Sequence, residues 1–167
     1  MQPSTTTKLK VGDKRVYPSH GVGEVVRIEE MEIAGKKQFF YVLQLLGNSE
    51  KVKVPVTNAG ILRDLIGEEE IQDLFDILKD RPVKASKESW NRLHRGYLEK
   101  FKTGSIYDIA EVMRDLYRKK QNEKQISNSE RTMLEKAEKL IVSEIAIARK
   151  QKEDKVKSDI ETILQAN

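Results

Sequence analysis

The spacing of the apolar residues changes once along the chain, close to Gly67, and this change constrains the fold more than any other feature. Before Gly67, apolar residues gather in short runs rich in Val, Phe and Tyr, as in strands. After it, they recur every three or four residues, as in amphipathic helices. We therefore predict an α+β protein with two domains, over residues 8–66 and 67–167.

The first domain is predicted to contain short strands. Residues 22–28 and 39–46 are apolar runs, and residues 51–54 alternate so that Lys51 and Lys53 face water while two valines face a core. Turn signals such as Ala34-Gly35 separate the runs, and we expect residues 62–66 to add a closing strand. Five short strands in about sixty residues favour a small β-barrel, because closure removes exposed sheet edges.

The second domain is predicted to be an all-α bundle of about five helices. Acidic residues at 68–70 suit a first turn, and Ser127 with Glu130 fits a capping box that opens a long stripe over residues 130–148. Ser86 and Ser105 are expected to cap two further helices. The first of these helices carries an apolar stripe and ends at Thr103-Gly104. The stripe comprises Trp90, Leu93, Tyr97, Leu98 and Phe101.

Composition argues against several classes of protein. The chain has no cysteine and only two histidines, His20 and His94, without metal-ligand spacing around either. No glycine-rich phosphate loop or nucleophile elbow is present, so we predict no enzyme, no metal and no cofactor. No run of 18 apolar residues and no N-terminal signal segment occur. We expect a soluble, cytoplasmic protein.

Charge is unevenly placed, although the net charge is only +4. Residues 67–78 hold five acids and no base, whereas residues 79–102 hold eight bases and three acids. The basic segment suits either a solvated helix face or a surface that binds phosphates. Trp90, the single tryptophan, starts the basic helix. Its spacing fits a core anchor, but an aromatic residue at a helix start also suits a wedge between base steps.

Five stretches together resemble the CarD/CdnL family of bacterial RNA polymerase-binding transcription regulators, and the resemblance covers nearly the whole chain, from about Leu9 to Leu164. Part of the first stretch also resembles the polymerase-interacting domain of the transcription-repair coupling factor, but the helical half favours the stand-alone regulator. The stretches are Val11–Gly23, Val52–Pro55, Trp90–Arg92, Ala110–Tyr117 and Ser127–Glu130.

The resemblance implies a Tudor-like (SH3-like) barrel that docks on the RNA polymerase β subunit, at its lobe or protrusion. It also implies a helical domain that meets promoter DNA at the upstream edge of the transcription bubble, where a tryptophan wedge hinders bubble collapse. The protein would be a monomer that reaches the nucleoid through polymerase. The implied polymerase contacts are Met31, Lys51, Lys53, Val54 and Pro55, and the implied DNA contacts are Trp90, Asn91, Arg92, Arg95 and Arg131.

Two departures from the family pattern keep other hypotheses open. Leu93 and His94 stand where an arginine and an aromatic residue are common, so the helical domain could contact DNA only nonspecifically. An adaptor is a second alternative, in which the stripe at 130–148 binds another protein instead of DNA. An enzyme would require His94 to cluster with carboxylates in a cleft.

Overall fold

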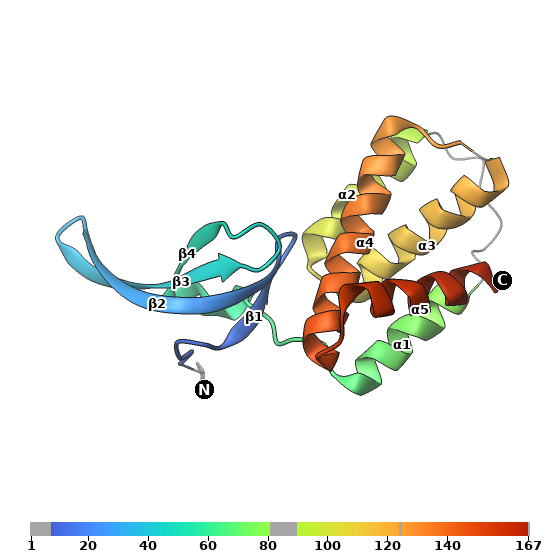
Figure 1. Ribbon diagram of the computed structural model, residues 1–167. Helices are drawn as coiled ribbons and strands as arrows, with labels where there is room; N and C mark the ends of the chain where they lie inside the picture. The colour runs from blue at the N-terminus through green and yellow to red at the C-terminus, as the bar shows by residue number, and fades with distance from the viewer. Residues whose placement is uncertain (1–7, 81–89, 124, 167) are drawn as a thin grey trace. The chain divides into compact units, whose positions relative to one another are not determined.

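The computed structural model describes residues 8–80, 90–123 and 125–166, which divide into two units between Leu65 and Ile66. In the described ranges, the first unit contains the strands and the second contains the α-helices (Figure 1). Each unit has its own apolar core. Ile66 belongs to the helical core, one residue before the predicted start of the second domain. No helix in the described ranges is long and apolar enough to cross a membrane.

Four antiparallel strands form a single sheet in chain order, as expected of a meander. The core of this unit contains Leu9, Val25, Tyr41, Leu43 and Val54, and the Leu9 N–H donates to the Tyr41 hydroxyl at 3.1 Å. The predicted turn at Ala34-Gly35 is present, and both residues have positive φ angles, as tight hairpin turns require. The strands are β1 (Lys14–Tyr17), β2 (Gly21–Ile33), β3 (Lys36–Leu45) and β4 (Lys51–Pro55).

The predicted fifth strand is reduced to a single bridge. After β4 the chain forms a 3-10 helix, η1 (Val56–Ile61), and then Arg63 exchanges two backbone hydrogen bonds with Val16 of β1. Pairing stops there because Ile66 is buried in the helical core, where its N–H donates to Glu144 Oε2 at 2.9 Å. The sheet is therefore closed back on β1 at one residue pair only.

The β2–β3 hairpin is longer than the sequence indicated. β1 pairs with β2 only as far as Glu24, and β4 pairs with β3 only from Phe40 onward, so residues 30–33 and 36–39 form a two-stranded extension (Figure 1). Met31, Ile33 and Phe39 are exposed there. Their exposure explains the missed length, since no core-facing alternation marks this part of the hairpin.

The second unit has the predicted number of helices. The Ser127–Glu130 capping box is confirmed: the Glu130 N–H donates to Ser127 Oγ at 3.1 Å, and the Ser127 N–H donates to Glu130 Oε1 at 2.9 Å. Ser86 lies outside the described residues. The helices are α1 (Glu68–Lys79), α2 (Trp90–Thr103), α3 (Ile106–Glu123), α4 (Asn128–Arg149) and α5 (Glu153–Gln165).

The stripe of α4 forms the centre of the bundle. Ala137, Ile141 and Ile145 are fully buried, and they pack with Met113 of α3 and Ile160 of α5. Most of this stripe is therefore covered by the other helices, and Leu140 and Ala148 are only partly buried, which weakens the observation on which the adaptor hypothesis rested.

Candidate functional site

Four of the five predicted polymerase contacts lie on one face of the sheet. Cross-strand pairing aligns Arg27 of β2 with Val42 and Lys53, and aligns Glu29 with Phe40 and Pro55. Directly opposed residues share a face of a sheet. We call Arg27, Glu29, Met31, Lys53 and Pro55 the Lys53 face.

The two cations of the Lys53 face share one carboxylate. Glu29 accepts a hydrogen bond from Arg27 Nε at 2.7 Å and forms an ion pair with Lys53 Nζ at 3.0 Å. The hydrogen bond from Arg27, followed by that from Lys53, holds the pKa of Glu29 below its usual value. Lys53 Nζ also lies 4.0 Å from the sulfur of Met31. The face is thus a small, connected surface in which the two cations are fixed by one carboxylate.

Two predicted contacts differ in their placement. Lys51 is exposed and lies on the same face, two residues before Lys53 along β4. Val54 is only 1% exposed and packs in the core beside Tyr41. Alternate residues of a strand point to opposite faces, so Val54 points into the core while Lys53 points outward. The Val54 side chain therefore holds β4 in position and is not available to a partner.

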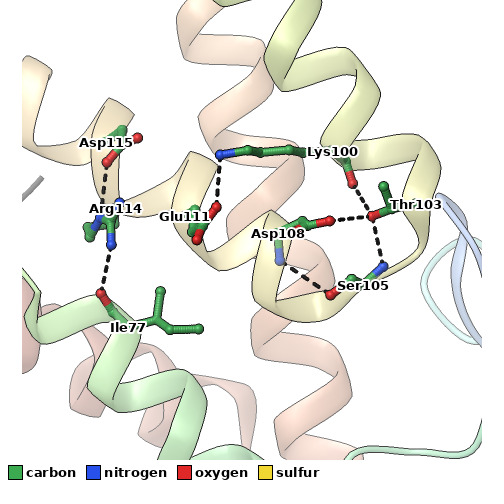
Figure 2. Close-up of polar contacts among 8 residues, drawn as sticks. All are labelled: Ile77, Lys100, Thr103, Ser105, Asp108, Glu111, Arg114 and Asp115. Carbon is green, nitrogen blue, oxygen red and sulfur yellow. Dashed lines mark hydrogen bonds and ion pairs between the residues drawn. The ribbon is translucent and has the colours of Figure 1, made fainter. Parts of the chain in front are cut away.

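α2 is attached to the bundle through its C-terminal half (Figure 2). Phe101 is buried, Lys100 Nζ pairs with Glu111 of α3 at 2.8 Å, and the Thr103 hydroxyl donates to Asp108 at 2.7 Å. Burial, with a smaller contribution from nearby carboxylates, raises the pKa of the half-buried Tyr97 to about 12. These contacts fix the direction in which the N-terminal half of α2 projects.

The N-terminal half of α2 presents the predicted DNA-contacting arginines. Arg92 and Arg95 are exposed, as is Arg131 in the first turn of α4. The guanidinium groups of Arg95 and Arg131 have no hydrogen-bond or ion-pair partner in the part of the chain that the structure describes. α2 starts at Trp90, but the side chains of Trp90 and Asn91 lie outside the described residues, so the choice between core anchor and wedge remains a prediction.

A groove separates α2 from α4, and no local sequence pattern indicates it. Its volume is about 450 Å³, and no aspartate or glutamate lines it among the residues described. Among the described residues, His94 therefore does not cluster with carboxylates in this cleft. We call this cleft the α2–α4 groove, and its main lining residues are His94, Leu98, Phe101, Thr132, Met133 and Lys136.

A second groove lies on the other side of α4 and has the opposite character. This α4–α5 groove has a volume of about 410 Å³ and is lined by four acids and two lysines, one of which, Lys157, pairs with Glu138 at 3.3 Å. Within the described ranges, no group of three or more His, Asp and Glu side chains has the geometry of a metal site. The acids are Glu135, Glu138, Glu153 and Asp154.

Comparisons with known proteins cover both units. Residues 9–66 match the family model of the CarD-like/TRCF RID domain, and residues 73–161 match that of the CarD C-terminal domain. YdeB of Bacillus subtilis strain 168, a candidate transcription factor by name, is 32% identical over 156 residues, covering 90% of this chain and 98% of YdeB. The solved structure of CdnLNt from Myxococcus xanthus is 45% identical and covers 40% of this chain and 97% of its own, with a TM-score of 0.33.

Proposed function

The chain belongs to the CarD/CdnL family and is a transcription factor of that type, and from this premise we propose that it binds RNA polymerase and stabilises the promoter open complex. The Lys53 face binds the β subunit at its lobe or protrusion. The N-terminal half of α2 binds promoter DNA at the upstream edge of the transcription bubble, and Trp90 acts there as a minor-groove wedge. The protein acts as a monomer in the cytoplasm and reaches the nucleoid through polymerase.

The match of residues 9–66 to the RID domain supports the polymerase contact. The Lys53 face lies within this match, and its exposed members present a thioether, a proline ring and paired charges on ordered strands. A surface whose side chains are already fixed loses little conformational entropy on binding. These properties suit a modest but specific contact between proteins.

The exposed arginines at the start of α2 support the DNA contact, and this is the observation that carries the proposal. Arg92 and Arg95 follow the Trp90 position within the first two turns of the helix and are exposed, and Arg131 adds a third exposed guanidinium. Arginines bind phosphates and fix the protein on the duplex, while an apolar wedge partly unstacks a base step. Such contacts read deformable or opened DNA more than base sequence.

The two contacts act together because one chain carries both. Binding of the sheet unit to polymerase raises the local concentration of the helical unit beside the DNA, so the second contact needs little affinity of its own. This arrangement agrees with the small net charge of +4. A protein that found promoters without polymerase would need a much stronger electrostatic attraction.

The proposal is tested by separating the two contacts with point variants. Trp90→Ala should shorten the lifetime of the polymerase–promoter open complex by about fivefold to a hundredfold, as loss of one aromatic contact to a base predicts. It should leave polymerase affinity unchanged. Lys53→Glu should weaken polymerase binding first. Open-complex lifetime is measured by challenge with a competitor, and polymerase affinity by titration of labelled protein.

Two controls keep this test specific. Trp90→Phe retains an aromatic ring and should preserve much of the lifetime effect, and Lys10→Glu places the same charge change on an exposed residue outside the Lys53 face. Circular dichroism checks the helices of each variant. If Trp90→Ala melts the helical unit, Trp90 is a core anchor and the wedge mechanism is rejected.

A further inference from the structure

The α2–α4 groove combines an apolar interior with a polar rim. Phe101 and Met133 are buried beneath it, whereas Leu98 is 41% exposed on its rim. Asn128, Ser129 and Thr132 of α4 line the same groove with an amide and two hydroxyl groups. A ligand for this groove therefore needs an apolar face and polar edges.

The charges around the groove favour an anion. Lys136 lies on the rim with Nζ 5.1 Å from the ring centroid of Phe101, and the unpaired guanidinium groups of Arg95 and Arg131 belong to the same two helices. No acid lines the groove in the described chain, although the α4–α5 groove on the same helix has four. The two grooves thus differ in sign, and only the α2–α4 groove complements a phosphate.

The position of the groove connects it with the Trp90 position. His94 and Leu98 lie one and two turns after Trp90 along α2, so the groove continues the helix face that begins at the proposed wedge. A flat apolar face, polar edges and a negative charge together describe a nucleotide. Only an unstacked base can enter a groove, because a base within a duplex exposes its edge alone.

We propose that the α2–α4 groove binds one unpaired nucleotide of promoter DNA next to the Trp90 wedge, a role that rests on the function proposed above. The base lies against the His94 imidazole and Leu98, since histidine rings and apolar side chains accept unstacked bases. The phosphate lies at Lys136. The protein thereby binds the displaced base as well as the gap that the wedge opens.

The test uses the full chain and fluorescently labelled forked DNA, a duplex with unpaired ends, at low salt. An abasic site is moved through the unpaired positions one at a time, and affinity is measured by anisotropy. At one position the abasic fork should bind about fivefold or more weakly than the intact fork, the loss expected for one stacked base. Leu98→Ser should weaken the intact fork to a similar degree and leave that abasic fork unchanged.

Matched lysine variants separate a local contact from general charge. Lys136→Ala and Lys139→Ala remove the same charge from exposed residues of α4, but Lys136 lines the α2–α4 groove and Lys139 lines the acidic one. Lys136→Ala should weaken fork binding more than Lys139→Ala does. Leu98 is exposed, so Leu98→Ser is expected to keep the fold, which circular dichroism verifies.

Three outcomes would overturn the nucleotide site. They are equal binding of intact and abasic forks at every position, an equal loss for Leu98→Ser on both forks, and no binding of any fork. None of these decides the proposed function, which depends on the effect of Trp90→Ala on open-complex lifetime. Conversely, the fork experiments could support the nucleotide site while Trp90→Ala leaves the open-complex lifetime unchanged. DNA binding by the groove would then stand, and the wedge mechanism would be rejected.

Discussion

The Lys53 face and the arginines near the starts of α2 and α4 are both basic in sequence, but their charges are arranged differently. On the Lys53 face, Lys53 and Arg27 share the carboxylate of Glu29 before any partner arrives. On the helical unit, the guanidinium groups of Arg95 and Arg131 have no partner in the described parts of the chain. A count of basic residues therefore does not distinguish a surface whose charges are already satisfied from one that is ready to bind anions.

This difference predicts different responses to salt. Phosphate binding by free cations releases counterions from DNA and weakens steeply as salt rises. A contact in which the charges are already paired gains less electrostatic free energy when the partner binds. Screening by salt therefore weakens such a contact less. Polymerase binding should therefore depend weakly on salt and DNA binding strongly, and the variants below are ordered by the size of the effect expected from each.

The largest effect is expected from removing the two unpaired guanidinium groups. Arg95→Gln with Arg131→Gln should lower the slope of log affinity for DNA against log salt by about 1.8, because each phosphate contact contributes about 0.9. Affinity near 0.1 M salt should then fall by about tenfold to a hundredfold. The measurement is fluorescence anisotropy with labelled forked DNA at several salt concentrations.

The control for this prediction removes equal charge from the same unit. Lys139→Gln with Lys152→Gln also deletes two exposed cations, but neither lies on α2 or in the first turn of α4. If both double variants lower the slope equally, DNA responds to net charge alone. The distinction between the two surfaces would then have no functional meaning.

A smaller effect, on stability, is expected at Glu144. This residue is 2% exposed, and its carboxylate accepts the buried Ile66 N–H where the helical unit begins. Glu144→Ala leaves that N–H without its acceptor and should destabilise the helical unit by about 1–3 kcal/mol. Denaturant unfolding followed by helical circular dichroism measures the loss, and the helices that carry the arginines should unfold earlier.

Glu144→Gln serves as the comparison, since its amide oxygen still accepts the Ile66 N–H. It should recover most of the stability that Glu144→Ala loses. Polymerase binding by the Lys53 face should survive in both variants at temperatures where the sheet unit is folded. Loss of polymerase binding in parallel with helix unfolding would show that the two units do not function separately.

The sequence predicted the elements well because local patterning decides them. The alternation over residues 51–54 correctly placed Lys53 outside and Val54 inside, and the Ser127–Glu130 box correctly marked the start of a helix. Leu98 shows the limit of this approach. It fits the apolar stripe of α2, but the helix contacts the bundle through Tyr97 and Phe101, which are four residues apart on one face, and Leu98 lies beside that face and is exposed.

Features that depend on distant partners were not predictable. Glu29 and Lys53 are paired by sheet register, and Glu144 meets Ile66 across 78 positions of the chain, so no local pattern indicates either contact. The α2–α4 groove was missed for the same reason, because two helices separated in sequence line it. The predicted site residues were placed by family resemblance, whereas their charge pairing required the structure.

The smallest effect is expected at Glu29, where the comparison is sharpest. Because hydrogen bonds from Arg27 and then Lys53 hold the pKa of Glu29 below its usual value, the carboxylate stays charged at and above the usual glutamate range. The attraction of this carboxylate for Arg27 and Lys53 is lost only as the pH falls through the lowered pKa of Glu29. Carboxyl-carbon NMR should therefore show Glu29 titrating below the usual range of a glutamate.

Glu29→Gln should then turn the Lys53 face into a surface with unsatisfied cations. We expect the midpoint of thermal unfolding to stay the same, because exposed ion pairs contribute little to stability. The affinity for polymerase should change by only a few-fold. It should become more sensitive to salt, because Arg27 and Lys53 would then pair with acidic groups of the polymerase. An unchanged salt dependence would mean that pairing within the face does not control how it binds.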